Sequence, residues 1–403
     1  MADILFLAHR IPYPPNKGDK IRSWHMLLHL AKRHSVYLGC FVDDPEDMAH
    51  VAFLRTICAD VCALPINPLH NKIRSLQGLL RDEALSVAFY RDARMTAWVD
   101  RVLGQGPMAA TVLFSSPVGQ FILGRGRVCG RTVMDFVDID SDKWRQYAEN
   151  KPWPMSWIYQ REQRKLLAFE RKMAATVQSS LFVSPKEAEL FQKLAPEVAA
   201  RVGHLNNGVD FNYFSPDHVF PSPYKMGERA LVFTGAMDYW ANVDAVDWFA
   251  RAIFPQIRAA APDTVFYIVG GKPMAAVQAL RSLPGVVVTG RVEDVRPYVA
   301  HAALAVCPLR IARGIQNKVL EGMAMAQPVV ATPQAFEGIE ATPGEHLLVA
   351  DGVDDFAATV LDVLSGRVDP ELGARARNCV MTNYSWDQNL KVLDILLDIQ
   401  DND

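Results

Sequence analysis

The sequence predicts an α/β protein made of two doubly wound, Rossmann-like domains, each built on a parallel sheet. Short apolar runs of strand length alternate with helical patterns along the chain, which is typical of repeated strand–helix units. The chain has 403 residues, which is enough for two or three domains. Residues 216–227 are rich in proline, serine and charge, and this linker composition separates the two series of runs.

The expected strands are apolar runs bounded by turn residues. They are Ile4–Ala8, Val36–Val42, Val61–Leu64, Thr111–Phe114, Thr132–Phe136 and Leu181–Ser184 in the first half, and Ala230–Thr234, Val265–Val269, Val286–Thr289, Leu304–Cys307, Val329–Thr332 and Leu347–Val349 in the second. A terminal helix is expected over Tyr384–Asp401. The predicted domains cover residues 1–215 and 216–385, and they face a central cleft at the carboxyl ends of the strands.

The composition argues against several classes of protein, namely nucleic-acid-binding, membrane-spanning, secreted and metal-binding proteins. The formal net charge of −3 gives no electrostatic argument for binding nucleic acid. No apolar run approaches the length of a membrane span, and the run that starts at Ile4 lacks a basic leader, so it predicts a first strand and not a signal peptide. The six cysteines are scattered through apolar runs, which indicates reduced thiols in a cytoplasmic protein. Their spacing does not favour a metal site.

The most informative stretch is residues 308–332, where we expect a strand end, a loop, a helix over Ile315–Ala326 and a further strand. Gly314, Asn317, Lys318 and Glu321 stand at offsets of three, four and seven, so they share one side of that helix. A glycine at a helix start exposes backbone N–H groups to an anion, and Lys318 adds positive charge. Glu321 can accept hydrogen bonds from ribose hydroxyls, which suits a nucleotide-sugar. The alternative is an ordinary solvated helix face.

The same stretch resembles the signature of family-4 (group 1) glycosyltransferases, a Glu-x7-Glu pattern followed by Pro-Val-Val-Ala-Thr. Glu321 matches the second glutamate, whereas Arg313 replaces the first, which in the family contacts the transferred sugar. The resemblance implies donor contacts by Gly314, Ile315, Gln316, Asn317, Lys318 and Glu321. It also leaves Arg313 as a catalytic candidate in place of that first glutamate.

The loop after the first strand, residues 9–23, carries three prolines and then Gly18. Gly18 precedes a helix and is flanked by Lys17, Lys20 and Arg22, so this loop can hold a phosphate or the transferred sugar. A rigid surface loop with solvated lysines is the alternative. The resemblance favours donor contact by Gly18 and Lys20, because family members have a glycine loop here that closes over the donor.

Four aspartates fall within the eight residues 135–142, at and just after the end of the expected strand Thr132–Phe136. They could activate an acceptor hydroxyl or bind a metal, or they could simply cap a helix. We select Asp138 and Asp140 as catalytic candidates, because the resemblance places an acceptor-side residue, often histidine, after this strand.

In the second half, Gly235 ends a strand where many family members carry an Arg and a Lys that grip the diphosphate. This sequence has neither, so Arg310, Arg313 and Lys318 are the expected replacements. The loop Gly290–Val292, with Arg291 at its centre, is the expected contact for the nucleobase through backbone groups. A solvated loop is the alternative for Arg291.

A helix expected over Trp157–Lys172 mixes basic and apolar residues, which could suit an anionic membrane surface. Glu162 and Glu170 favour a solvated face instead. Family members often handle lipid-linked acceptors, so peripheral contact with the inner membrane face stays open.

The resemblance covers nearly the whole chain and is strongest to the sugar transferases associated with exosortase (PEP-CTERM) exopolysaccharide clusters. It implies the GT-B fold, with the C-terminal helix 386–403 packed back on the first domain. It implies a retaining hexosyltransferase that moves a sugar from a nucleotide-diphosphate donor to a glycan or lipid-linked acceptor, with no metal and no cofactor. A nucleotide-sugar 2-epimerase and a non-catalytic binding protein on the same fold are the alternatives.

Overall fold

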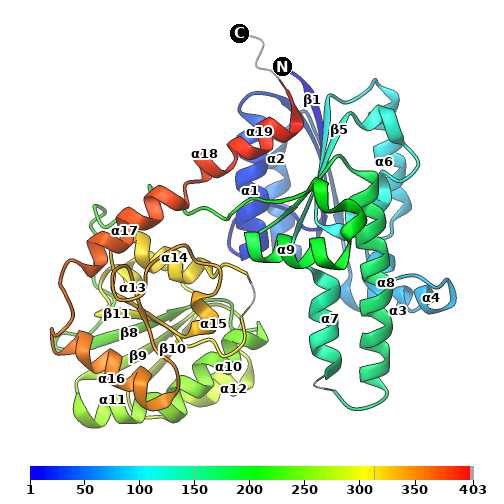
Figure 1. Cartoon of the computed structure of the whole chain (residues 1–403). Coiled ribbons are helices and arrows are strands. Elements are labelled where there is room, and N and C mark those ends of the chain that lie inside the picture. Colours follow the sequence, from blue (N-terminus) through cyan, green and yellow to red (C-terminus); the bar gives the residue numbers. More distant parts are fainter. Residues whose placement is uncertain (150, 313, 400–403) are drawn as a thin grey trace. The chain divides into compact units, whose positions relative to one another are not determined.

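The computed structural model describes residues 1–149, 151–312 and 314–399. The chain forms two compact units: unit 1 contains Met1–Asn206 and the segment that begins at Asp387, and unit 2 contains Asn207–Trp386. In each unit helices cover both faces of a parallel sheet (Figure 1). The predicted fold class, two α/β units on parallel sheets, is confirmed.

Unit 1 is built on a seven-stranded sheet in the order β3-β2-β1-β4-β5-β6-β7, and every described pairing in it is parallel. Its strands are β1 (Asp3–Ala8), β2 (Ser35–Val42), β3 (Asp60–Pro65), β4 (Ala110–Phe114), β5 (Arg131–Val137), β6 (Ser179–Phe182) and β7 (Val202–His204). The chain starts in the middle, runs outward to β3 and then returns to β4 on the other side of β1. The carboxyl ends of β1 and β4 therefore form a topological switch point, which is where ligands bind in such sheets.

The principal helices of unit 1 follow the strands. They are α1 (Gly18–Ala31), α2 (Val51–Ile57), α3 (Pro68–Ser75), α4 (Gln77–Leu80), α5 (Leu85–Phe89), α6 (Ala93–Gly104), α7 (Asp140–Glu149), α8 (Met155–Thr176), α9 (Pro185–Leu194) and α19 (Lys391–Leu397), with α18 (Trp386–Asn389) at the unit boundary. Figure 1 shows α7 and α8 side by side, projecting beyond the sheet.

A buried ion pair ties α1 to the sheet of unit 1. The Arg22 guanidinium donates from Nε to Asp135 at 2.7 Å and from Nη1 to the carbonyl of Leu205, also at 2.7 Å. The side chains of Arg22 and Asp135 are 1% and 0% exposed. Removing one partner of such a pair leaves an uncompensated buried charge, so the pair fixes both α1 and the end of β7.

The segment after Asp387 belongs to unit 1 through α19. Asp394 accepts from His29 at 2.8 Å and from Arg33 at 2.7 Å, and both of these basic residues lie at the end of α1. Residues 207–215, by contrast, belong to unit 2 and lie before the expected boundary at residue 215. A hydrogen bond ties this segment to unit 2, because the backbone amide of Val209 donates to the carbonyl of Tyr384 at 2.8 Å and both residues lie in unit 2.

Unit 2 is built on a six-stranded sheet in the order β10-β9-β8-β11-β12-β13, also with parallel pairings. Its strands are β8 (Arg229–Thr234), β9 (Thr264–Val269), β10 (Val286–Gly290), β11 (Leu304–Cys307), β12 (Val329–Ala331) and β13 (Leu348–Val349). Its helices are α10 (Trp240–Trp248), α11 (Phe254–Ala260), α12 (Ala275–Ala279), α13 (Arg296–Ala300), α14 (Asn317–Ala324), α15 (Pro333–Phe336), α16 (Val353–Leu364) and α17 (Leu372–Asn383). The switch point of this sheet lies between β8 and β11.

Among the described helices, none combines the length and the apolar composition that a bilayer crossing requires.

Candidate functional site

The candidate site in unit 2 centres on α14, at the carboxyl edge of the sheet. The helix begins at Asn317 with Gln316 as its N-cap, later than the expected start at Ile315. We expected Gly314 to share the helix face with Lys318 and Glu321, but it lies before the helix. It adopts a left-handed backbone with φ +63° and turns the chain there. Ile315 is buried, and the side-chain amide of Gln316 donates to the Gly314 carbonyl at 3.1 Å, so both residues shape the loop.

Lys318 stands on the first turn of α14, beside the end of β8. Its ammonium donates to the side-chain oxygen of Asn242 at 2.5 Å and lies 4.4 Å from the centre of the Phe233 ring. Burial lowers the pKa of Lys318 to about 8, although Cys307 and Glu321 act in the opposite direction. The ammonium is therefore fixed in position and only partly solvated.

Glu321 follows one turn later on the same side of α14. Burial raises the pKa of this carboxyl to about 7, and Lys318 partly offsets the rise. A half-buried carboxyl and ammonium thus lie together with perturbed pKa values, which is an arrangement common at ligand sites.

The strand ends beside Lys318 approach each other closely. A Cβ on Gly270, which follows β9, would clash with the carbonyl oxygen of Gly235, which follows β8. A Cβ on Gly235 would lie 2.8 Å from Nδ2 of Asn242, whose amide also donates to the Ala236 carbonyl at 2.9 Å. Only glycines allow these loops to pack together and leave the Lys318 ammonium at the edge of the sheet.

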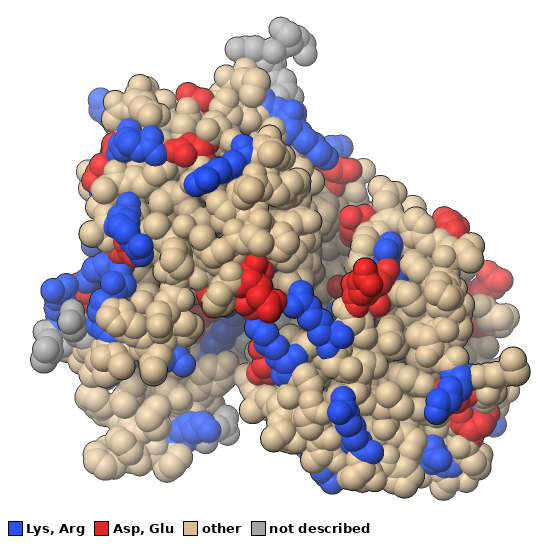
Figure 2. Space-filling model, turned by 180° about the vertical axis from the view of Figure 1, so that it is seen from behind, with Lys and Arg blue, Asp and Glu red and all other residues tan. Residues whose placement is uncertain are grey.

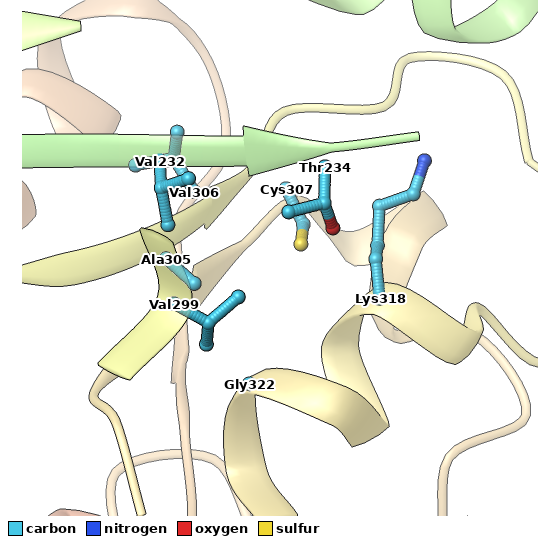
Figure 3. Close-up of a pocket in the computed structure, with 8 residues that line it drawn as sticks. All are labelled: Val232, Thr234, Val299, Ala305, Val306, Cys307, Lys318 and Gly322. Carbon is cyan, nitrogen blue, oxygen red and sulfur yellow. The ribbon is translucent and has the colours of Figure 1, made fainter. Parts of the chain in front are cut away.

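Figure 3 shows Lys318 reaching from α14 toward the end of β8, beside the other residues that line a small cavity. The cavity lies between β8, β11 and α14, and its volume is about 10 Å³. It is lined by Val232, Thr234, Val299, Ala305, Val306, Cys307, Lys318 and Gly322. Such a volume holds about one water molecule. A larger ligand would therefore contact the outer edge of the sheet and not this cavity.

The other expected donor contacts of unit 2 lie around α14 or the neighbouring strand ends. The Asn317 side chain accepts from Asn207 at 3.2 Å. Gly290 ends β10, its carbonyl accepts from the Gly270 amide at 3.2 Å, and Arg291 and Val292 follow it as exposed and half-buried residues. The role of this loop in binding the base stays a prediction.

We expected Arg310 to bind a phosphate, but its side chain already has other partners. Its guanidinium is paired with Asp244 at 2.5 Å and lies 5.3 Å from the Trp248 ring, so α10 already neutralises it. Arg313, the catalytic candidate at the position of the family's first glutamate, lies outside the described residues.

In unit 1, Gly18 is the first residue of α1, as expected for a glycine at a helix start. The expectation that Lys20 contacts the donor needs correction. Its side chain is 1% exposed and its ammonium lies 2.5 Å from Asp47, so this buried pair takes up the charge that we expected to meet a phosphate. Arg22, buried against Asp135, likewise supports the fold.

Asp138 and Asp140 flank one ammonium after β5. Each has a carboxylate oxygen 3.0 Å from Nζ of Lys143. Burial disfavours the charge on Lys143, but the two aspartates outweigh it and hold its pKa well above the usual value. Across the described ranges, no group of three or more His, Cys, Asp or Glu side chains is arranged to hold a metal ion.

The backbone before Asp138 is strained. Val137 has φ +70°, an uncommon backbone for a β-branched residue, and the register with β6 shifts at this point. One oxygen of Asp138 is buried and has no hydrogen-bond partner in the described part of the chain. A strained strand end with an unpaired carboxylate oxygen marks a candidate acceptor-side site.

Sequence reasoning missed a second polar group at the switch point of unit 1. His9 follows β1, and its ring lies 3.4 Å from Ser115 Oγ, after β4, and 3.4 Å from Asp19. Arg10 pairs with Asp19 and lies 3.0 Å from Asp43. Burial opposes ionisation of Asp19, but His9 and Arg10 outweigh it and lower its pKa. The signal that could have found this group is the position of His9 and Ser115 directly after neighbouring strands.

Two further polar atoms at this edge, Ser116 Oγ and Asp43 Oδ1, are buried without a hydrogen-bond partner among the described residues. Buried polar atoms are rarely left unpaired, so these two are available for hydrogen bonds to water or to a polar ligand.

Comparison with known proteins agrees with the geometry. Residues 228–366 match the family model of the Glycosyl transferases group 1. Over 208 residues the chain is 30% identical to a GDP-mannose-dependent alpha-(1-6)-phosphatidylinositol monomannoside mannosyltransferase of Mycolicibacterium smegmatis. This match covers 47% of the chain and 54% of the relative, so it spans about half the length of that protein.

Solved structures of low identity share the whole fold. HepE of Anabaena in complex with UDP and glucose has a TM-score of 0.67 at 14% identity, over 99% of this chain and 100% of that one. WaaG, a glycosyltransferase involved in lipopolysaccharide biosynthesis, has a TM-score of 0.68 at 17% identity, over 98% and 99%. Sucrose-phosphate synthase of Thermosynechococcus elongatus has 0.69 at 15%, over 99% and 98%. The chain therefore has the GT-B fold, and its second unit is similar to the group 1 glycosyl transferases.

Proposed function

We propose that the protein is a glycosyltransferase that moves a hexose from a nucleotide-diphosphate donor to a glycan or lipid-linked acceptor. The observation that carries this proposal is the pair Lys318 and Glu321, held beside Asn242 at the carboxyl edge of the unit 2 sheet. This pair lies within the segment that matches the group 1 family.

Each donor contact has a chemical reason. The diphosphate lies at the N-terminus of α14, where the positive end of the helix dipole and the Lys318 ammonium attract an anion. Glu321, one turn further along, accepts hydrogen bonds from the ribose hydroxyls. The loop Gly290–Val292 contacts the base through its backbone. These charges stabilise the leaving diphosphate, and the reaction needs neither a metal nor another cofactor.

The similar proteins support a sugar-nucleotide donor. HepE has been solved with UDP and with UDP-glucose, and the mycolicibacterial relative depends on GDP-mannose. The resemblance to exosortase-associated sugar transferases supports a reaction on the cytoplasmic side that serves exopolysaccharide synthesis, with retention at the sugar carbon.

The acceptor lies against unit 1 in this proposal. Asp138 and Asp140 with Lys143, and the group around His9, offer hydrogen-bonding partners for sugar hydroxyls at the ends of β1, β4 and β5. Their unpaired buried oxygens support a polar ligand of this kind.

Two measurements test the function. A thermal-shift screen of nucleotide-sugars identifies the donor, because a ligand that binds only the folded state raises the melting temperature. Turnover of that donor is then followed with and without a glycan acceptor, and the anomeric configuration of the product is read by NMR. A glycosylated acceptor supports the proposal, and an inverted anomeric centre would contradict retention.

The same assay separates the alternatives. Release of an epimerised nucleotide-sugar without any acceptor would identify a 2-epimerase. Donor binding without turnover under any acceptor would identify a binding protein and overturn the proposal.

A further inference from the structure

Helix α3 (Pro68–Ser75) of unit 1 buries polar side chains and exposes apolar ones. Its buried residues are polar: Asn71 is 9% exposed and Ser75 is 6% exposed. Its outer face is apolar, with Leu69 at 70% exposed, Ile73 at 62% and Leu76, directly after the helix, at 53%. These three side chains recur at helical spacing and form one stripe along the surface.

Two hydrogen bonds to a neighbouring segment fix the orientation of this helix. The side-chain amide of Asn71 donates to the Phe89 carbonyl at 2.9 Å, and Arg74 donates to the Arg91 carbonyl. The Ser75 hydroxyl donates to the Lys72 carbonyl at 2.7 Å, within the helix. Rotating the helix to bury Leu69 and Ile73 would break the bonds of Asn71 and Arg74, so the exposed stripe follows from the fold.

The segment that follows α3 is anchored in the same way by α8. Arg161 donates to the carbonyls of Gly78 and Glu83, both at 3.0 Å. Glu162 accepts from the backbone amides of Leu85 at 2.7 Å and Ser86 at 2.8 Å. Leu79 lies between these anchors and is 37% exposed, so it extends the stripe. We call Leu69, Ile73, Leu76 and Leu79 the α3 stripe.

Basic residues accompany the α3 stripe. Between Pro68 and Arg81 the sequence contains Lys72, Arg74 and Arg81 and no acidic residue. The side chains of Lys72 and Arg81 are exposed. Figure 2 shows one face of the molecule, with lysine and arginine side chains and some acidic ones along its left edge. An apolar stripe among cations complements a surface that is apolar inside and anionic outside.

We propose that the α3 stripe inserts into the interface of an anionic lipid membrane and holds unit 1 on it. Leucines and isoleucines of an in-plane amphipathic helix enter the boundary of headgroups and acyl chains, while neighbouring lysines and arginines contact anionic headgroups. A protein partner is less suited to this surface, since aromatic and arginine anchors dominate protein interfaces and the stripe itself consists of aliphatic residues.

This proposal goes beyond the sugar transfer and moves the membrane contact away from the expected helix Trp157–Lys172. That helix is α8, and Arg161, Glu162 and Glu170 on it are buried. Its first turn exposes Trp157 at 52%, and the residue Trp153 before it is 81% exposed, so these two tryptophans form the competing membrane contact.

Co-sedimentation of the full chain with phosphatidylcholine vesicles, with and without phosphatidylglycerol, tests the proposal. The wild type should bind the anionic vesicles, and added salt should weaken the binding. The double variant Leu69→Gln/Ile73→Gln should bind at least about tenfold more weakly and keep its melting temperature, because both side chains are exposed. The control Val219→Gln/Met226→Gln, at two fully exposed apolar positions of unit 2, should bind like the wild type.

Several outcomes would overturn the proposal. They are no binding of the wild type to anionic vesicles, unchanged binding by Leu69→Gln/Ile73→Gln, and loss of binding only in Trp153→Ser/Trp157→Ser. Light scattering that shows a dimer lost in Leu69→Gln/Ile73→Gln, without vesicle binding, would assign the stripe to a second copy of the chain. Transfer to a soluble acceptor should stay unchanged in the stripe variant, so a failure of the membrane proposal is separable from a failure of the sugar transfer.

Discussion

Lys318 and Asn242 are joined by a hydrogen bond of 2.5 Å between the ammonium and the side-chain oxygen, across the start of α14 and the start of α10. Asparagine is neutral, so this bond orients the ammonium without neutralising its charge. Arg310 differs in this respect, since Asp244 neutralises it at 2.5 Å. Of these two described cations, Lys318 is therefore the one whose charge is more available to an anion.

Replacement of Asn242 with aspartate tests that relationship. Asn242→Asp is nearly isosteric but adds a carboxylate beside Lys318, so the affinity for a nucleoside diphosphate should fall by about 1–3 kcal/mol. Isothermal titration calorimetry measures the change, and the matching nucleoside without phosphates serves as the control ligand. Equal losses for both ligands would mean that the variant damages the site as a whole.

The affinity for the diphosphate should also depend on the charge of Lys318. Its pKa is lowered to about 8 by burial, so the ammonium loses its proton as the pH rises from 7 to 9. Binding of the nucleoside diphosphate should weaken over this range by roughly tenfold, since a charged hydrogen bond is lost. In Lys318→Arg the charge persists, and the affinity should be nearly constant from pH 7 to 9. A wild type without this pH dependence would exclude Lys318 as the phosphate contact.

Glu321 should hold the ribose of the donor. In Glu321→Ala the affinity for the nucleoside diphosphate should fall by about 1–3 kcal/mol, which is the range for a lost hydrogen bond to a charged group. Calorimetry with the nucleoside alone should show a similar loss, because the ribose is present in both ligands. Glu371→Ala, at an exposed glutamate before α17, is the matched control. Unchanged affinity in a folded Glu321→Ala protein would remove the assignment.

The stability of unit 1 should decrease with rising pH because of Glu170. Burial raises the pKa of this carboxyl from 4.5 to about 8, and Asp140 adds to the rise, while Ser141 lowers it. The folded state therefore keeps a proton that the unfolded chain releases, and the stabilising contribution declines between pH 4.5 and 8. Glu170→Gln stays neutral, so at pH 9 it should be more stable than the wild type by on the order of 3 kcal/mol. Scanning calorimetry at pH 5 and 9 checks this, and an equal difference at both values would contradict it.

The pair Arg22 and Asp135 should be the most sensitive electrostatic contact of unit 1. Arg22→Met leaves Asp135 charged, buried and unpaired, so the unfolding free energy should fall by about 3–5 kcal/mol. The double variant Arg22→Met/Asp135→Leu should recover part of that loss. Arg251→Met removes the exposed pair with Asp247 and should cost at most about 1 kcal/mol in denaturant unfolding. A loss no larger than that of Arg251→Met would show that the buried pair does not hold the unit.

The strands could be predicted from the sequence because they are buried apolar runs between turn residues. Every predicted run overlaps an observed strand, and most ends agree within a residue or two. The strand β7 was missed, because Val202–His204 is short, contains a glycine and lies directly after a helical turn. The start of α14 was placed too early, because only the left-handed backbone of Gly314 shows that the loop continues to Gln316.

The candidate site could be predicted only where its residues are neighbours in sequence. Lys318 and Glu321 share a helix turn, and their spacing alone puts them together. The burial of Lys20 depends on Asp47, and the group around His9 joins Asp19 and Ser115, so these contacts between distant positions have no local signal. For α3 the helical spacing of Leu69, Ile73 and Leu76 predicts one apolar face, but the bond from Asn71 to Phe89 decides that this face points outward.

Unit 1 is discontinuous in sequence, since it contains Met1–Asn206 and the segment from Asp387 onward, and the whole of unit 2 lies between them. A ribosome therefore delivers the whole of unit 2 before it delivers Asp394, the partner of His29 and Arg33. Unit 2 can close while the chain is still being made, whereas the end of α1 waits for a segment translated after several hundred other residues. During that interval the surface under α19 is uncovered in the nascent chain, and this is the stage at which a chaperone or a premature stop would act on the first unit and spare the second.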